Sequence, residues 1–158
     1  MANPRYRRLQ YDHQSLVSLA RANPCVSLQP VDLLLPPEQY LVAITCRSIT
    51  SIAGGPHFAQ MHQFLLHLHN DYPRRPPVIT WRTAIFHPNI LPPERGGATC
   101  IGGWTPSESL NDLVVRLVDM AQYRNYSLKS VLNEAAAEWA RRNASMFPLD
   151  SVVLTIPE

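Results

Sequence analysis

The sequence predicts an α+β fold in which helices cover an antiparallel sheet. An amphipathic helical pattern opens the chain, short apolar runs separated by turn residues follow it, and two more helical patterns come after an irregular loop. The chain has 158 residues, of which 46% are hydrophobic, and this is enough apolar material for one core. We therefore expect a single domain over residues 1–158, with a short tail from about residue 144.

The first predicted element is an amphipathic helix over residues 4–22. Its apolar positions recur at spacings of three and four residues: Tyr6, Leu9, Leu16, Val17 and Ala20. Asn23 and Pro24 close this segment, because proline does not continue a helix.

Three or four antiparallel strands in a meander are predicted next. The apolar or alternating runs cover residues 26–35, 40–47, 59–69 and 78–82. Clusters rich in proline, glycine and asparagine separate these runs, and such residues favour rigid turns. Consecutive runs joined by short turns indicate antiparallel pairing.

An irregular loop and two helices are predicted after the sheet. Residues 84–108 hold too many prolines and glycines for regular structure, and long loops in compact domains are usually functional. One helix is predicted over 110–121 with Ser109 as its N-cap, and another over 132–143. Residues 151–156 are rich in β-branched side chains, which leaves open an added strand or a loose surface segment.

Charge and hydropathy exclude two classes of partner. The net charge is +2, and the basic residues are scattered apart from Arg5, Arg7 and Arg8, so we expect no nucleic-acid partner. No apolar run approaches the roughly 18 residues of a membrane-spanning helix, and no apolar block follows the polar start to form a signal peptide. We therefore expect no membrane partner and a cytoplasmic location.

Three cysteines form an odd set that argues against a disulfide framework. Cys100 lies in the irregular loop with glycines on both sides, so its thiol is expected to be accessible. Cys25 and Cys46 lie in strand-like apolar surroundings, where cysteine usually packs as a small buried hydrophobic residue. Cys100 is therefore the candidate nucleophile.

Histidine pairs raise the alternative of a metal site. His67 and His69 share one face of a predicted strand, and His57 and His62 lie close in sequence. No acidic or thiolate partner completes a convincing ligand set. We expect exposed strand histidines and no bound metal.

Further landmarks flank Cys100 in a fixed order. Residues 72–77 read Tyr-Pro-Arg-Arg-Pro-Pro, 87–89 read His-Pro-Asn, 104–106 read Trp-Thr-Pro and 132–136 read Leu-Asn-Glu-Ala-Ala. In this order the landmarks resemble the core of the ubiquitin-conjugating enzymes, over roughly residues 5–143. The resemblance implies the fold of that family: an N-terminal helix, an antiparallel meander sheet, an irregular catalytic loop and C-terminal helices.

The resemblance implies an acyl transfer through Cys100. Such enzymes accept the C-terminal acyl group of a ubiquitin-like protein from an activating enzyme, hold it as a thioester and pass it to an amine. The implied partners are a ubiquitin-like protein, an activating enzyme, and a ligase or a direct protein target. A thiolate is nucleophilic and a thioester is reactive towards amines, so we expect no metal or organic cofactor, with ATP used by the activating enzyme alone.

The resemblance also assigns catalytic residues beside Cys100. Asn89 matches the family's asparagine, which donates a hydrogen bond to the oxyanion or orders the loop that presents the donor. The structural alternative is that Asn89 only satisfies backbone groups in a turn. Alignment at residues 132–133 puts Ser130 where the family has a residue that tunes the incoming amine. Ser127 and Tyr126 are rival candidates, and a helix cap at Ser130 is the structural alternative.

Three residues of the landmarks are expected to support the active site rather than to react. The resemblance implies that His87 holds the loop by hydrogen bonds, and Pro88 belongs to the same triplet. Tyr72 is predicted to be a turn and packing residue.

The sequence departs from the family pattern around Cys100. Residues 91–97 contain an apparent insertion, and the segment between Cys100 and Trp104 is shortened. The loops that dock ligases in the family are altered at residues 68–69 and 105–107, which argues against recognition by ordinary RING ligases. This divergence suggests a distant branch, such as the bacterial ubiquitin-like conjugation systems linked to antiphage defence.

The basic residues of the chain are almost all arginines. Lys129 is the one lysine among 14 basic residues. Genome composition explains this bias simply, but a lysine-poor surface would also limit self-modification, and Lys129 could itself be an acceptor.

The alternatives to a conjugating enzyme are a scaffold of the same fold that binds a ubiquitin-like protein, and a Cys-His hydrolase that uses Cys100 and His87.

Overall fold

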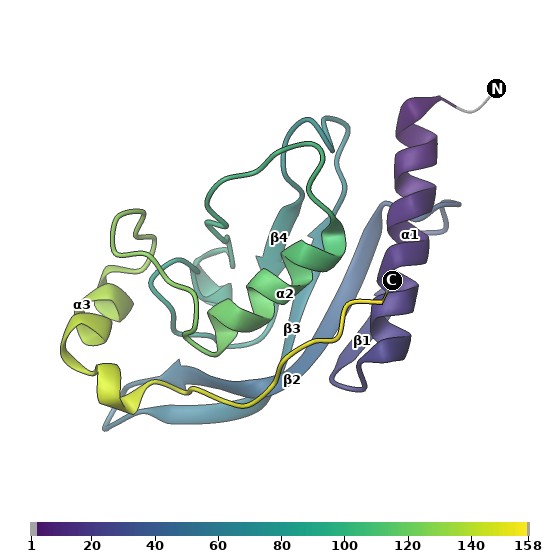
Figure 1. Ribbon diagram of the computed structural model, residues 1–158. Coiled ribbons are helices and arrows are strands. Elements are labelled where there is room, and N and C mark those ends of the chain that lie inside the picture. Colours follow the sequence, from purple (N-terminus) through teal and green to yellow (C-terminus); the bar gives the residue numbers. More distant parts are fainter. Residues whose placement is uncertain (1–2, 158) are drawn as a thin grey trace.

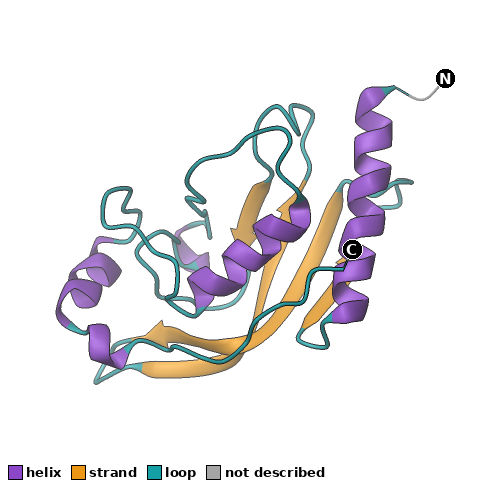
Figure 2. Ribbon diagram, in the orientation of Figure 1, coloured by secondary structure: helices purple, strands orange, loops and turns teal. Residues whose placement is uncertain are grey.

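The computed structural model describes residues 3–157, which form a four-stranded antiparallel sheet with helices on one face and at both sides (Figure 1). The strand order is β1-β2-β3-β4, so the predicted meander is confirmed. Helix α2 crosses the sheet, α1 lies beside β1, and α3 lies at the opposite end of the molecule from α1 (Figures 1 and 2). This is the predicted α+β arrangement.

Helix α1 (Pro4–Ala22) has the bounds that the apolar spacing predicts. Its N-cap is Asn3, whose side chain accepts a hydrogen bond from the backbone N–H of Tyr6 at 2.7 Å. Asn23 is its C-cap. The buried face consists of Leu9, Asp12, Leu16 and Leu19.

The first predicted strand, 26–35, is too long, and the second, 40–47, is too short. The strands are β1 (Val26–Pro30), β2 (Gln39–Ser51), β3 (His57–His67) and β4 (Val78–Trp81). Strand β2 continues to Ser51, whereas β1 stops pairing with β2 at Pro30, which faces Tyr40. The carboxylate of Asp32 accepts hydrogen bonds from the N–H groups of Leu34 and Glu38 and so shapes the intervening loop instead.

The main core lies between the sheet and α2 (Leu110–Ala121). Alternate residues of β2 point into this core, as the period of a strand requires: Tyr40, Val42, Ile44 and Cys46. The opposing face of α2 buries Leu113, Val114, Leu117 and Val118. Ser109 caps α2 as predicted, since its Oγ accepts a hydrogen bond from the N–H of Asp112 at 3.0 Å.

His62 was expected on an exposed strand face, and this prediction is wrong. The residue shares the inward face of β3 with Phe64 and Leu66 and is 1% exposed. Its Nε2 lies 2.9 Å from the carbonyl oxygen of Cys46, and burial lowers its pKa. Among the described residues no group of three or more His, Cys, Asp or Glu side chains is arranged to hold a metal ion.

Helix α3 (Glu134–Arg142) is shorter than the predicted span 132–143. It starts after Asn133, whose side chain accepts a hydrogen bond from the N–H of Ala136 at 3.1 Å. A second, smaller core anchors this end of the molecule: Ile49, Tyr123 and Ala140, with Ile52, Phe86, Trp139 and Phe147 packed around them.

The tail is neither an added strand nor a loose segment. Past Met146 it runs in an extended conformation across the molecule from α3 and ends beside α1 (Figure 1). The side chain of Asn23 bonds both backbone groups of Thr155, at 2.7 and 2.8 Å. Gln122 donates to the carbonyl oxygen of Val152, and Leu154 is buried. Side-chain hydrogen bonds hold the tail in place, and its described residues do not pair with a strand. The β-branched residues of the tail therefore did not by themselves predict its structure.

Within residues 3–157, no helix is long and apolar enough to cross a membrane.

Candidate active site

A pocket of about 110 Å³ lies over Cys100. Its walls come from the segments on either side of Cys100 and from the end of α2 and the loop after it: Asn89, Cys100, Ile101, Gly102, Met120, Asn125, Ser127 and Ser130. The three residues predicted to be catalytic, Cys100, Asn89 and Ser130, therefore line one pocket. Met120 and Asn125 were not predicted, because Met120 has the spacing of a core residue and Asn125 carries no motif.

Backbone hydrogen bonds hold Cys100 next to Asn89. The N–H of Cys100 donates to the carbonyl oxygen of Asn89 at 2.9 Å, and the N–H of Leu91 donates to Ala98 at 2.8 Å. Residues 91–98 thus leave the loop and return to it, so the predicted insertion forms an excursion that closes before Cys100. The 3-10 helix η1 (Pro93–Arg95) lies at its tip.

Gly97 fastens this excursion to the edge of β4. Its carbonyl oxygen accepts a hydrogen bond from the N–H of Trp81 at 2.9 Å, and its φ is +68°. A Cβ at this position would lie 2.5 Å from the carbonyl oxygen of Trp81. Only glycine permits this approach and this backbone conformation together.

The three thiols have different environments. Cys100 is half-buried at its pocket. Cys46 is buried in the core, and burial raises the pKa of its thiol to about 12. Cys25 is partly buried and packs against the same core. Since a thiol reacts as its thiolate, the environment of Cys46 suppresses its reactivity.

The side chain of Asn89 is buried and fully hydrogen-bonded. Its Nδ2 donates to the carbonyl oxygens of Ser127 and Ser130 at 2.9 and 2.8 Å, and its Oδ1 accepts from the N–H of Ser127 at 2.8 Å. Both amide protons therefore bind the loop that lines the pocket. This geometry corresponds to holding the backbone of the loop, as both the loop-ordering role and the structural alternative for Asn89 require. Donation to an oxyanion would require one of these bonds to break.

His87 and Pro88 fix the same loop at two further points. The Nδ1 of His87 accepts from the N–H of Asn89 at 3.0 Å, which makes Nε2 the donor to the carbonyl oxygen of Asn125 at 3.1 Å. Burial lowers the pKa of His87 to about 4. The carbonyl oxygen of Pro88 accepts from the N–H groups of Leu132 and Asn133.

The ring of His87 is therefore neutral and has both nitrogens engaged, so it is not available to activate Cys100 as a hydrolase would require.

Ser130 is exposed and lines the pocket. It is not the helix cap that was its structural alternative, since Asn133 is the N-cap of α3. Ser127 lines the pocket as well, but its Oγ accepts a hydrogen bond from the N–H of Lys129 at 3.1 Å. Tyr126 is not among the lining residues, and its ring packs against Phe147 with centroids 5.3 Å apart.

Tyr72 lies away from the pocket and connects α1 to the segment after Cys100. Its hydroxyl donates to Asp12 at 2.6 Å and accepts from Arg8 at 2.9 Å. Its ring lies 6.0 Å from that of Trp104, whose Nε1 donates to the carbonyl oxygen of Pro73. Asp12 is 0% exposed, and the helical pattern alone gave no sign that a carboxylate would be buried there.

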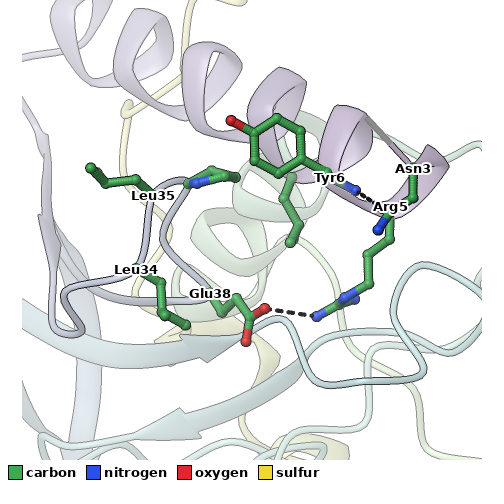
Figure 3. A pocket seen from close by; sticks show the side chains of 8 residues that line it. Asn3, Arg5, Tyr6, Leu34, Leu35 and Glu38 are labelled. Carbon is green, nitrogen blue, oxygen red and sulfur yellow. Dashed lines mark hydrogen bonds and ion pairs between the residues drawn. The ribbon is translucent and has the colours of Figure 1, made fainter. Parts of the chain in front are cut away.

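A separate pocket lies between the first turn of α1 and the loop before β2 (Figure 3). Tyr6 and the exposed Leu34 and Leu35 form its apolar sides, and Arg5 pairs with Glu38 at 3.3 Å across its floor. Neither Cys100 nor any other residue of the Cys100 pocket lines it.

The chain matches known proteins along most of its length. The ubiquitin-conjugating enzyme family model matches residues 20–151. "Ubiquitin-conjugating enzyme E2 S" of Drosophila ananassae is 29% identical over 114 residues, which are 65% of this chain and 52% of that protein. "SUMO-conjugating enzyme SCE1" of Arabidopsis thaliana is 29% identical over 66 residues, covering 38% of this chain and 39% of that protein.

A solved structure described as "Novel Ubiquitin-Conjugating Enzyme" has a TM-score of 0.64 at 22% identity and covers 90% of this chain and 89% of its own, so it shares the fold. The chain spans about half the length of the Drosophila relative. The family match extends over most of the chain, so this protein belongs to the ubiquitin-conjugating enzyme family.

Proposed function

We propose that this protein carries a ubiquitin-like protein as a thioester on Cys100 and transfers it to an amine. The observation that carries the proposal is the pocket that Cys100, Asn89 and Ser130 line together, in which the Asn89 amide holds the loop that carries Ser130. Family membership supports the class of reaction, a conjugating transfer that needs an activating enzyme and a ubiquitin-like protein as partners.

Two acyl transfers make up the proposed reaction. In the first, the Cys100 thiolate attacks the thioester carbonyl presented by the activating enzyme, and that enzyme's thiolate leaves. In the second, an acceptor amine attacks the new thioester, the Cys100 thiolate leaves, and the amine gives up a proton as the amide forms. ATP is consumed by the activating enzyme, and Cys100 needs no metal or organic cofactor for either step.

The loop after α2 is proposed to orient the incoming amine. Ser130 would accept a hydrogen bond from the amine with its hydroxyl, while Asn89 positions the loop from beneath. His87 and Pro88 would keep this arrangement by fixing the loop at Asn125 and at the start of α3. Tyr72 would support the site from a distance, through Trp104.

The test is to incubate the protein with an activating enzyme, ATP and a ubiquitin-like protein, and to compare reducing with non-reducing gels. We expect an adduct of the wild type that reductant removes and that Cys100→Ala abolishes. Cys25→Ala is the matched control, because it removes a partly buried thiol outside the pocket and should still load. Binding of the ubiquitin-like protein without any adduct, in the presence of an active activating enzyme, would favour a scaffold.

We further propose that the conjugation takes place in the cytoplasm and serves antiphage defence, with a direct protein target or an unusual ligase as the last partner. The support is the departure from the family pattern at the 91–98 excursion and in the ligase-docking loops. Plaque counts on bacteria expressing the complete conjugation system should rise for Cys100→Ala, and equal counts for wild type and variant would refute a defensive role.

A further inference from the structure

Lys129 carries the one lysine amine among the 14 basic side chains of this chain. The other 13 are arginines, and a guanidinium stays protonated at any working pH and so cannot attack a thioester. A lysine amine has a flexible four-carbon stem and attacks as soon as it loses its proton. For a protein that carries an activated acyl group, the chain therefore offers one internal side-chain acceptor of this kind.

The structure puts Lys129 at the rim of the Cys100 pocket. It is exposed, and it lies between Ser127 and Ser130, which both line the pocket. The Asn89 amide holds the backbone on both sides of it, at Ser127 and at Ser130. Its own N–H donates to the Oγ of Ser127 at 3.1 Å. The backbone that carries this amine is thus held between two residues that line the Cys100 pocket.

The first helix lies far from the loop that carries Lys129 (Figure 1). The described chain begins at Asn3, beside α1, at the opposite side of the molecule from the yellow-green loop between α2 and α3 (Figure 1). The inference concerns Lys129, whose neighbours Ser127 and Ser130 line the Cys100 pocket, because proximity raises the rate of an intramolecular attack.

We propose that Lys129 is a site of self-conjugation, modified by the acyl group that its own Cys100 carries; this inference rests on the proposed function. The Lys129 Nζ, as the neutral amine, attacks the carbonyl carbon of the thioester. The C–N bond forms, the C–S bond breaks, Cys100 leaves as a thiolate, and the amine proton passes to solvent. The product is an isopeptide-linked adduct that reductant does not cleave.

The test follows two adducts of the same protein. Wild type, Lys129→Arg and the double variant Lys129→Arg/Arg21→Lys are charged as above, chased without further ATP, and mapped by peptide mass spectrometry. Arg21→Lys restores one exposed lysine in the last turn of α1, far from the loop (Figure 1). A separate mixture of charged Lys129→Arg with Cys100→Ala measures transfer between molecules.

We expect all three proteins to form the reductant-sensitive thioester. The reductant-resistant adduct should map to Lys129 in the wild type, fall at least tenfold in Lys129→Arg and stay absent from the double variant, and Cys100→Ala in the mixture should remain unmodified. A resistant adduct that persists in Lys129→Arg, returns in the double variant or appears on Cys100→Ala would overturn the inference while the thioester stands. Absence of the thioester itself would overturn the proposed function and this inference together.

Discussion

The side-chain amide of Asn89 donates a hydrogen bond to the backbone carbonyl of Ser130 at 2.8 Å, across 41 positions of sequence. A second bond from the same nitrogen reaches Ser127 at 2.9 Å. One buried side chain thus holds both ends of the loop segment that faces Cys100. The position of the thiol and the position of the loop are coupled here, because the carbonyl oxygen of Asn89 also binds the N–H of Cys100.

Asn89→Asp should disorder the loop over Cys100. The carboxylate keeps the acceptor for the Ser127 N–H but replaces two N–H donors by oxygen, which faces the carbonyl oxygens of Ser127 and Ser130. Losing these two part-buried hydrogen bonds costs roughly 0.5–1.5 kcal/mol each. Hydrogen exchange of residues 125–130 should accelerate, and transfer from the Cys100 thioester to free lysine should slow.

Cys25→Ala is the matched control for this prediction, since it leaves the loop hydrogen bonds intact. Unchanged exchange in Asn89→Asp would mean that other contacts hold the loop.

The lowered pKa of His87 predicts that the protein loses stability in mild acid. Burial lowers its pKa to about 4 in the folded state, whereas histidine in an unfolded chain titrates near 6.5. As the pH falls from about 6.5 to about 4, His87 binds a proton in the unfolded state but stays neutral in the folded state. The free energy of unfolding should therefore fall by up to about 3 kcal/mol over this range. Urea denaturation at pH 7 and pH 5 measures the effect.

The comparison with His87→Gln isolates this contribution. Glutamine can still donate to the Asn125 carbonyl but does not titrate, so its pH dependence should be flatter. His62, whose pKa burial also lowers, is common to both proteins, as is Asp12, whose pKa burial raises and whose effect has the opposite sign. Equal slopes in the two proteins would contradict the prediction.

Gly97→Ala should loosen the excursion before Cys100. The left-handed φ of +68° costs an alanine roughly 1–2 kcal/mol, and the added Cβ would meet the Trp81 carbonyl oxygen at 2.5 Å. Gly96→Ala is the matched control, because its φ is +107° but nothing lies within 4 Å of its Cβ position. Thermal denaturation should show a larger loss for Gly97→Ala, and a loss no larger than that of Gly96→Ala would mean that the contact with β4 is unimportant.

Ser130 and Ser127 can be separated by their effects on transfer. Ser130→Ala removes a hydroxyl exposed at the pocket, whereas Ser127→Ala removes the acceptor of the Lys129 N–H bond inside the loop. We expect Ser130→Ala to slow the attack of free lysine on the thioester several-fold, with an unchanged melting temperature and an unchanged rate of thioester formation. A slower transfer in Ser127→Ala alone would assign the positioning role to Ser127.

Local patterns in the sequence were sufficient to predict much of the fold. Apolar spacing gave the bounds of α1, and Ser109 marked the start of α2, because both depend on neighbours within a turn of helix. The first strand was predicted too long, since its end depends on the pairing of Pro30 with Tyr40 and on the Asp32 turn. His62 was misplaced although its two-residue spacing from Phe64 carried the signal.

The sequence by itself determined which thiol to consider, the order of the elements and the family. Only the tertiary structure decided that Asn89 orders the pocket loop, that Lys129 lies at its rim and that the tail is tied to Asn23. The reason is physical: a helix or strand pattern reports contacts a few residues away, whereas the Asn89 to Ser130 and Asn23 to Thr155 bonds join residues 41 and 132 positions apart. Such bonds exist only once the sheet and α2 have packed.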